Sequence, residues 1–163
     1  MPMSQPRWIT ISMACVSSLV FGSVSAQAAQ ISGVIATTLT IFDNSRLVGD
    51  VTCLQLDNGP CINFGAPDIK LDLNGFTITG PADPPANCTS APADGIAAVG
   101  HDGIEIHGPG VIQNFKRRGI SLVQLSGATV KRVVSQHNCS TGLMLRFVSS
   151  SLVEGVVAMT PLI

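Results

Sequence analysis

Residues 95–145 read GIAAVGHDGIEIHGPGVIQNFKRRGISLVQLSGATVKRVVSQHNCSTGLML, and one short pattern returns in them at a steady interval. A glycine followed by an aliphatic residue occurs as Gly95-Ile96, Gly119-Ile120 and Gly142-Leu143. The interval from one pair to the next is nearly constant, at about two dozen residues. A repeat of this length is typical of a solenoid, in which each turn buries its inward face on the next.

An earlier pair, Cys61-Ile62, has the same small-then-aliphatic character but lies too far before Ile96 to fit one interval. Residues 81–94 account for the surplus, because they hold a proline-rich stretch that can form neither a helix nor a central strand. We therefore expect a loop insertion at 81–94 within an otherwise regular repeat.

A second aliphatic segment follows each first one, at residues 69–73, 104–106, 130–133 and 153–156. Val130 and Val153 are separated by the same interval, and apolar residues mostly alternate with polar ones, as in strands with one buried face. The predicted inward residues are Ile62, Ile69, Leu71, Ile96, Ile104, Ile106, Ile120, Leu122, Val130, Leu143, Leu145 and Val153.

These patterns predict an all-β fold, a parallel β-solenoid of about four rungs. Burial of each large aliphatic side chain would contribute roughly 1.5–3 kcal/mol. The alternative is a β-sandwich, whose strands recur every 8–12 residues. A sandwich gives no reason for the glycine–aliphatic pair to return at the observed interval.

Asn114 and Asn138 are separated by one repeat, and each follows the second strand region of its rung. Asparagine tolerates the left-handed conformation of a tight corner, and stacked amides can hydrogen-bond along a column. We therefore predict a structural corner role for both, and no catalytic one.

The composition excludes several classes of protein. The chain has 163 residues, of which 45% are hydrophobic and 12% charged, with a formal net charge of −1. One domain is expected, and neither a nucleic-acid binder nor a polybasic membrane module fits this balance. The histidines and cysteines show no ligand spacing, so no metal site is predicted.

Residues 1–28 have the features of a signal peptide. Arg7 supplies the positive start, an apolar run covers residues 8–24, and Ala26 and Ala28 supply the small residues before a cleavage site. An uncleaved anchor is the alternative, but the run is shorter than the ~20 residues of a spanning helix. Cys15 raises a lipoprotein alternative, yet the leucine expected three residues before a lipidated cysteine is missing. The predicted organisation is a signal peptide at 1–28, a cap or first strands at 29–60, and repeats at 61–163.

Removal of residues 1–28 leaves four cysteines, an even number that indicates disulfides in an exported protein. Three pairings are available. We favour Cys53–Cys61, which closes a short loop through a strong turn sequence. Cys88–Cys139 would then fix the proline-rich loop to the same edge of the solenoid two rungs later, across about 10 Å.

Several motifs resemble those of exported bacterial proteins with right-handed parallel β-helix repeats, in the pectate-lyase-like superfamily. They lie at residues 50–53, 59–62, 71–81, 106–112 and 138–143. The resemblance covers about residues 35–157 and implies a right-handed parallel β-helix. It implies no single function, because that superfamily contains lyases, hydrolases, epimerases, tailspikes and members without known activity. Members usually continue for several more rungs and a cap, so a truncated chain is expected, with self-association through the last rung as an alternative.

Two basic groups are the predicted ligand-binding residues. Lys116, Arg117 and Arg118 form the one basic run, at a corner, and could bind a uronic-acid polymer. Lys131 and Arg132 are outward, with Lys131 expected beside Glu105 and Glu154 as a surface ion-pair ladder. His107 is a candidate general base, but the sequence shows no acid partner beside it. Other outward acidic candidates are Asp72 and Asp102.

Three functions compete on this reading. The favoured one is a secreted or periplasmic protein that binds carbohydrate or a cell-surface partner through its flat face. The second is a polysaccharide lyase or epimerase, the one case in which Ca²⁺ would be a cofactor. The third is a structural or assembly module. No nucleic-acid partner, and no membrane span after signal cleavage, is expected.

Overall fold

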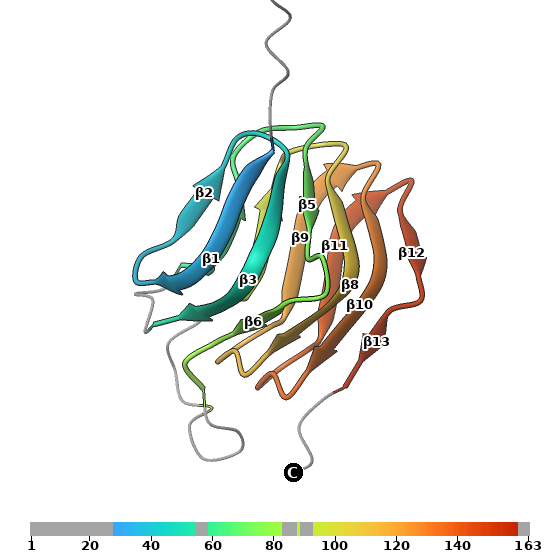
Figure 1. The fold of residues 1–163 in the computed structure, drawn as a ribbon. Coiled ribbons are helices and arrows are strands. Elements are labelled where there is room, and N and C mark those ends of the chain that lie inside the picture. The colour runs from blue at the N-terminus through green and yellow to red at the C-terminus, as the bar shows by residue number, and fades with distance from the viewer. Residues whose placement is uncertain (1–27, 55–58, 83–87, 89–92, 160–163) are drawn as a thin grey trace, which may run out of the picture.

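The computed structural model describes residues 28–54, 59–82, 88 and 93–159, and within them the chain forms strands and no helix. Apart from Ala28, the predicted signal peptide lies outside the described residues. The strands, shown in Figure 1, are β1 (Ala29–Ile35), β2 (Leu39–Ile41), β3 (Ser45–Cys53), β4 (Ile62–Phe64), β5 (Lys70–Asp72), β6 (Thr77–Thr79), β7 (Ile96–Val99), β8 (Glu105–Gln113), β9 (Ile120–Ser126), β10 (Thr129–Gln136), β11 (Leu143–Ser149), β12 (Leu152–Glu154) and β13 (Val157–Ala158).

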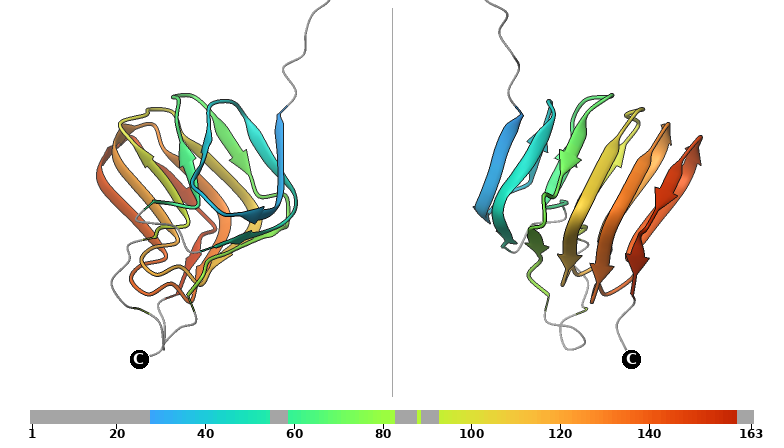
Figure 2. Two further views of the ribbon diagram at one scale, coloured as in Figure 1. Left: turned by 90° about the vertical axis from the view of Figure 1, so that its left-hand side faces the viewer. Right: turned by 45° about the vertical axis from the view of Figure 1, so that its right-hand side comes forward.

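The strands form two parallel sheets. Sheet A has the order β1-β3-β5-β8-β10-β12, with β6 beside β3 and β8 and with β13 beside β10. Sheet B has the order β11-β9-β7-β4-β2. The chain alternates between the sheets, so each passage through sheet A and then sheet B makes one coil, and the coils lie side by side (Figure 2). This arrangement confirms the prediction of an all-β fold with parallel strands and is consistent with a β-solenoid.

The strand register follows the sequence repeat. In sheet B, Ile62 pairs with Ile96, Ile96 with Ile120, and Ile120 with Leu143. Leu39 pairs with Ile62 and adds an earlier position of the same column, which the glycine–aliphatic pattern misses because no glycine precedes it. In sheet A the corresponding column runs Leu71, Ile106, Val130 and Val153.

Nine of the twelve predicted inward residues are buried, namely Ile62, Ile69, Leu71, Ile96, Ile104, Ile106, Ile120, Leu122 and Val130. The prediction of burial is wrong for Leu145 and Val153, which are 37% and 44% exposed, and Leu143 is half-buried. These three belong to β11 and β12, the edge strands of the two sheets, so no described strand covers them from the far side. Their inward direction is the same as in the earlier coils, because their register partners are buried.

The repeated glycines lie where one coil closes against the next. The carbonyl of Gly119 accepts a hydrogen bond from the N–H of Ile96 at 2.9 Å, and that of Gly142 accepts one from Ile120 at 2.9 Å. A Cβ atom on Gly119 would meet the hydroxyl of Ser135 and would lie 2.8 Å from the amide nitrogen of Asn138. The glycine of the repeat is therefore required by the close approach of neighbouring segments.

Asn114 has the predicted left-handed conformation, with φ at 61°. In the next coil His137, with φ at 51°, takes that position, because Gln113 pairs with Gln136. Asn138 lies one residue further, fully buried, where its Oδ1 accepts from the N–H of Phe115 at 3.0 Å. The left-handed role predicted for Asn138 is therefore wrong, and its amide instead connects two neighbouring corners.

The structure contains both favoured disulfides. Cys53 and Cys61 are joined across eight residues, and Cys88 and Cys139 across 51 residues, with Cα–Cα distances of 5.8 and 5.3 Å. Cys139 follows β10, whereas Cys88 precedes β7, so the second bond joins segments two coils apart. Two disulfides are compatible with an extracellular or periplasmic location.

Candidate ligand-binding face

The outer surface of sheet A carries a continuous column of polar side chains, one from each coil, which we call the charged column. Strand pairing places its members side by side, and their charges largely alternate in sign. Its members, in order across the sheet, are Gln30, Arg46, Asp72, His107, Lys131 and Glu154. The sheet thus presents a charged row along the axis of the solenoid.

A second outward row runs two residues earlier on the same strands. Lys70 pairs with Glu105, and Glu105 pairs with Thr129. The side-chain oxygen of Asn44 accepts a hydrogen bond from the backbone N–H of Lys70 at 2.8 Å. The two rows together form a band of charged and hydrogen-bonding groups on one side of the molecule.

His107 lies at the centre of this band. Its Nε2 atom is 3.0 Å from Oε2 of Glu105 but makes no hydrogen bond of good geometry within the described part of the chain. Asp72 and Lys131 flank it on the neighbouring strands. The expectation that no acid lies beside His107 is therefore wrong. Glu105 and His107 are two residues apart on one strand, which puts both on the same face, and this signal is present in the sequence.

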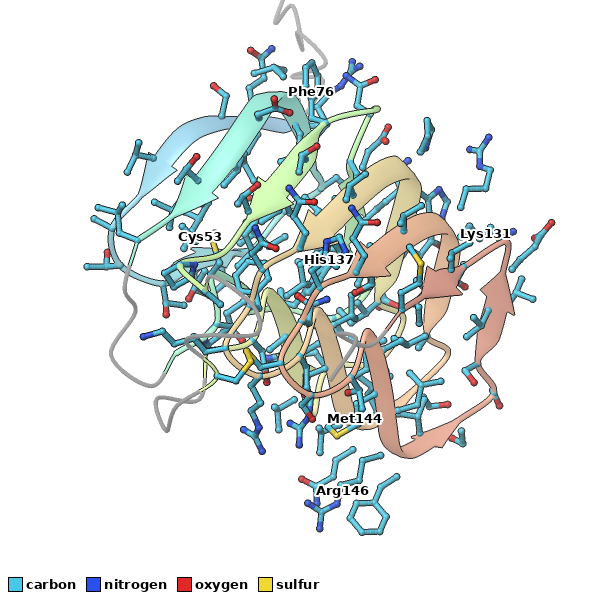
Figure 3. All side chains as sticks on the ribbon, turned by 90° about the horizontal axis from the view of Figure 1, so that it is seen from below. Cys53, Phe76, Lys131, His137, Met144 and Arg146 are labelled. Atoms are coloured by element: carbon cyan, nitrogen blue, oxygen red, sulfur yellow. A yellow bond between two sulfur atoms is a disulfide. The ribbon has the colours of Figure 1, made fainter. Side chains whose placement is uncertain are left out.

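Lys131 forms the predicted ion pair with Glu154, at 3.6 Å between Nζ and Oε2. Its other predicted neighbour, Glu105, instead faces Thr129, because β8 and β10 pair two residues out of the expected register. Arg132 is exposed and has the left-handed conformation at a register shift in β10. It is therefore not a member of the charged column. Figure 3 shows Lys131 on a different side of the coil from Met144 and Arg146 of sheet B.

The basic run 116–118 lies at the corner between β8 and β9, beyond the strand ends that Gln113 and Gln136 mark. Lys131 is five residues before Gln136, so the structure does not bring the two predicted basic groups together. Arg118 is not free. Its Nη1 lies 3.7 Å from Oδ2 of Asp94, and its backbone N–H donates to Oδ1 of Asp94 at 3.2 Å.

Burial raises the pKa of Asp94 above its ordinary value of 3.8, and the nearby Arg118 and Arg117 offset only part of this rise. The folded state therefore holds the carboxyl proton more tightly than the unfolded state does. It follows that this group's contribution to the free energy of unfolding is most favourable below pH 3.8 and is lost as the pH rises through the raised pKa.

We expect Asp94→Asn to remove this pH dependence, because the amide cannot ionise. Urea unfolding of both proteins at a series of pH values measures the difference. The stability of the variant relative to the parent should increase as the pH rises from 3.8, even if the loss of the Arg118 partner lowers its absolute stability. A difference that stays constant over the series would contradict this account.

A third row, on the second part of sheet A, is uncharged. Nε2 of Gln136 donates to Oε1 of Gln113 at 3.0 Å, and Nε2 of Gln113 donates to the hydroxyl of Thr79 at 3.4 Å. The amide ladder expected from asparagines is thus formed by glutamines. Groups of this kind both donate and accept hydrogen bonds, as the hydroxyl groups of sugars require.

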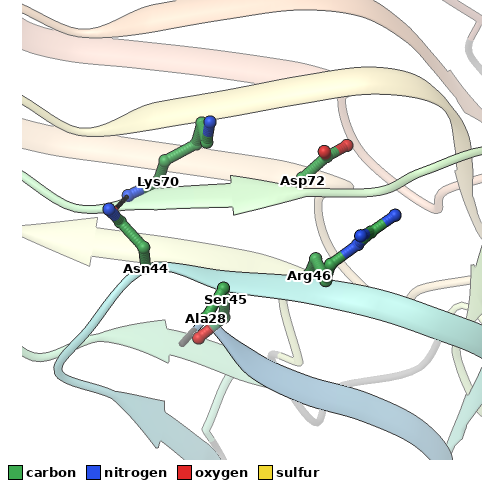
Figure 4. Close-up of a pocket in the computed structure, with 6 residues that line it drawn as sticks. All are labelled: Ala28, Asn44, Ser45, Arg46, Lys70 and Asp72. Atoms are coloured by element: carbon green, nitrogen blue, oxygen red, sulfur yellow. Dashed lines mark hydrogen bonds between the residues drawn. The ribbon is translucent and has the colours of Figure 1, made fainter. Parts of the chain in front are cut away.

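A hollow of about 280 Å³ lies at the start of sheet A, on the outer face (Figure 4). Its lining residues come from the beginnings of the first three coils, and they are Ala28, Asn44, Ser45, Arg46, Lys70 and Asp72. Among them, only Asp72 is an outward candidate on the sequence alone.

The described residues contain no group of three or more His, Cys, Asp or Glu side chains that could hold a metal ion. Among the same residues, no helix is long and apolar enough to span a membrane. Comparison of the sequence with protein-family models finds no match. Searches of the curated proteins and of the solved structures find no match either.

Proposed function

We propose that this chain is an exported right-handed parallel β-helix repeat protein, similar to the pectate-lyase-like superfamily, which binds carbohydrate through the outer face of sheet A. The predicted signal peptide at 1–28 supports export, and two disulfides agree with it. The parallel pairing of successive sheet A strands supports the right hand, because such crossovers are nearly always right-handed.

The observation that carries the binding function is the set of in-register polar rows. A linear polymer presents the same groups at regular intervals. In this fold, neighbouring members of the charged column, and likewise Gln113 and Gln136 of the third row, lie on adjacent strands about 4.8 Å apart. Hydroxyl groups would pair with the amides of Gln113 and Gln136, and acidic or basic substituents with the charged column.

We expect His107→Gln to weaken glycan binding at least about fivefold, because His107 is central to the charged column. A glycan array identifies the ligand, and calorimetry on it gives the dissociation constant. The matched control is Lys116→Gln with Arg117→Gln, at the corner between β8 and β9 and outside the charged column. An unchanged affinity for His107→Gln, with a loss in the corner variant, would move the site to the basic run predicted from the sequence.

A polysaccharide lyase or epimerase is a second candidate, favoured by the surroundings of His107. Glu105 lies 3.0 Å from its Nε2, and Lys131 and Asp72 are beside it. An imidazole so placed can remove the proton next to a uronate carboxylate, while Lys131 offsets the developing charge. The formation of unsaturated uronate from acidic polysaccharides, with Ca²⁺ present and lost in His107→Gln, would establish this activity.

Exposed apolar side chains at the last coil favour an additional role in assembly. Phe147 is 70% exposed, and Leu152, Val153 and Val157, which follow it in the sequence, are exposed as well. Association of two copies through this end would bury these side chains. Light scattering behind size-exclusion chromatography measures this, and a monomer at all concentrations would exclude it.

A further inference from the structure

The hollow at the start of sheet A has unused positive charge. Arg46 and Lys70 line it from adjacent strands, and neither has a carboxylate within 4.0 Å among the described residues. Asp72, the one acidic residue of the lining, uses Oδ1 to accept the backbone N–H of Asn74 at 3.0 Å. Two cationic side chains are therefore available to a ligand in the hollow.

The predicted cleavage point falls at the same place. Ala28 is part of the lining, and Ala29 begins β1, where its N–H donates to the carbonyl of Asn44 at 2.9 Å. Hydrolysis of the bond between them by a signal peptidase consumes one water, leaving a carboxylate on the departing leader and an ammonium group on Ala29. One N–H of that ammonium keeps the bond to Asn44, and the others are free at the edge of the hollow.

We propose that removal of the leader after Ala28 completes an anion-binding site formed by the α-ammonium of Ala29, the guanidinium of Arg46 and the ammonium of Lys70. Cleavage changes the formal charge around the hollow from +1 to +2, since Arg46 and Lys70 outweigh Asp72 by one before it. It also removes Ala28 from the lining. The uncleaved chain thus lacks the third cation and keeps Ala28 in the lining.

The ligand is the carboxylate or sulfate group of a sugar. A hollow of about 280 Å³ is at the lower limit of small-molecule sites, so it accepts one sugar unit. Oxyanions are the partners that ammonium and guanidinium groups bind most strongly. This proposal rests on the proposed export and carbohydrate binding, and it adds that the first three coils hold an acidic unit only after processing.

The test uses the chain processed during export, with its first residue determined by N-terminal sequencing. Acetylation at about pH 6.5 modifies the α-amine in preference to lysine, since the α-amine has much the lower pKa. The acetyl form is a matched control, because it restores an uncharged N–H at position 29 that can still donate to Asn44. Glucuronate and sulfate are titrated into both forms at low ionic strength.

We expect acetylation to weaken the binding of both anions about tenfold, which lies between the effect of one charge in bulk water and its larger effect near a protein surface. Arg46→Gln and Lys70→Gln should each weaken it similarly, and Arg146→Gln, in β11 of sheet B, should leave it unchanged. Equal affinities for the free and acetylated forms, or a first residue other than Ala29, would overturn the proposal.

A glycan array run on both forms separates this inference from the proposed function. Equal array signals from the two forms, with equal anion affinities, would overturn the maturation site and leave carbohydrate binding in place. No array signal from either form, with anion binding lost on acetylation, would overturn carbohydrate binding and support the maturation site.

Discussion

Gly119→Ala is expected to lower the free energy of unfolding by about 4 kcal/mol, because the added methyl group enters a buried hydrogen-bonded network. The hydroxyl of Ser135 donates to the carbonyl of Gly142 at 2.8 Å, and the amide nitrogen of Asn138 donates to that hydroxyl at 3.1 Å. The new Cβ would meet the hydroxyl itself and would lie 2.8 Å from both Asn138 Nδ2 and the carbonyl of Gly142. Ser135 and Asn138 are fully buried, so water cannot replace a bond that is broken.

Urea denaturation of the oxidised protein measures this change. The matched control is Gly49→Ala in β3, where the nearest atom to the new Cβ is the side-chain Cβ of Ser32 at 3.1 Å, and φ is not in the left-handed region. We expect Gly49→Ala to change stability by less than about 1 kcal/mol. Similar midpoints for both variants would show that Gly119 is not held at a close approach between coils.

Removal of the Cys88–Cys139 disulfide by alanine at both positions is expected to destabilise the protein by about 4 kcal/mol. The bond closes a segment of 51 residues, and the entropy that it removes from the unfolded chain grows with that length. The same relation gives about 2.5 kcal/mol for Cys53 and Cys61, whose sequence separation is eight. Both values are a large fraction of the stability of an ordinary domain.

Denaturation of the two double variants, each with the other disulfide intact, tests this order. Cys88 is exposed, so its replacement leaves no cavity, whereas Cys53 and Cys61 are buried and add a packing loss to their variant. The m-value separates the loss of the cross-link from the loss of packing, because an unfolded chain without the cross-link is more expanded and exposes more surface. A Cys88/Cys139 variant as stable as the parent, with an unchanged m-value, would contradict the expected restriction of the unfolded state.

The sequence predicts the coils of this protein better than the contacts between them. Gly119-Ile120 and Gly142-Leu143 reveal the period because the close approach of the coils admits only glycine there. Leu39 occupies the same column but is preceded by Thr38, so the recognisable pattern starts one coil late. Both disulfides are predictable, because one closes a turn and the other follows from the position of the loop in the repeat.

The face of sheet A is less predictable for a physical reason. Arg46, Asp72 and His107 are neighbours in space, but they are distant in the chain and unequally spaced, because the connecting loops differ in length. The register shift in β10 between Lys131 and Val133 also displaces pairs without changing which face is polar. Alternation in the sequence therefore identifies the outward side chains but not their neighbours.

The two ends of the stack of coils differ in how well their inward side chains are buried, and this difference determines the end at which unfolding begins. In the first coil Ile31, Ile35 and Ile41 are buried, whereas the inward Leu145 and Val153 of the last coils are exposed. Because each coil is stabilised mainly by its neighbours, local opening starts where burial is least and advances coil by coil. Backbone amides of β12 and β13 would thus exchange with solvent before those of β3. Fraying would spread from that end toward β1, and the hollow beside Ala29 would be the last part of the face to lose its shape.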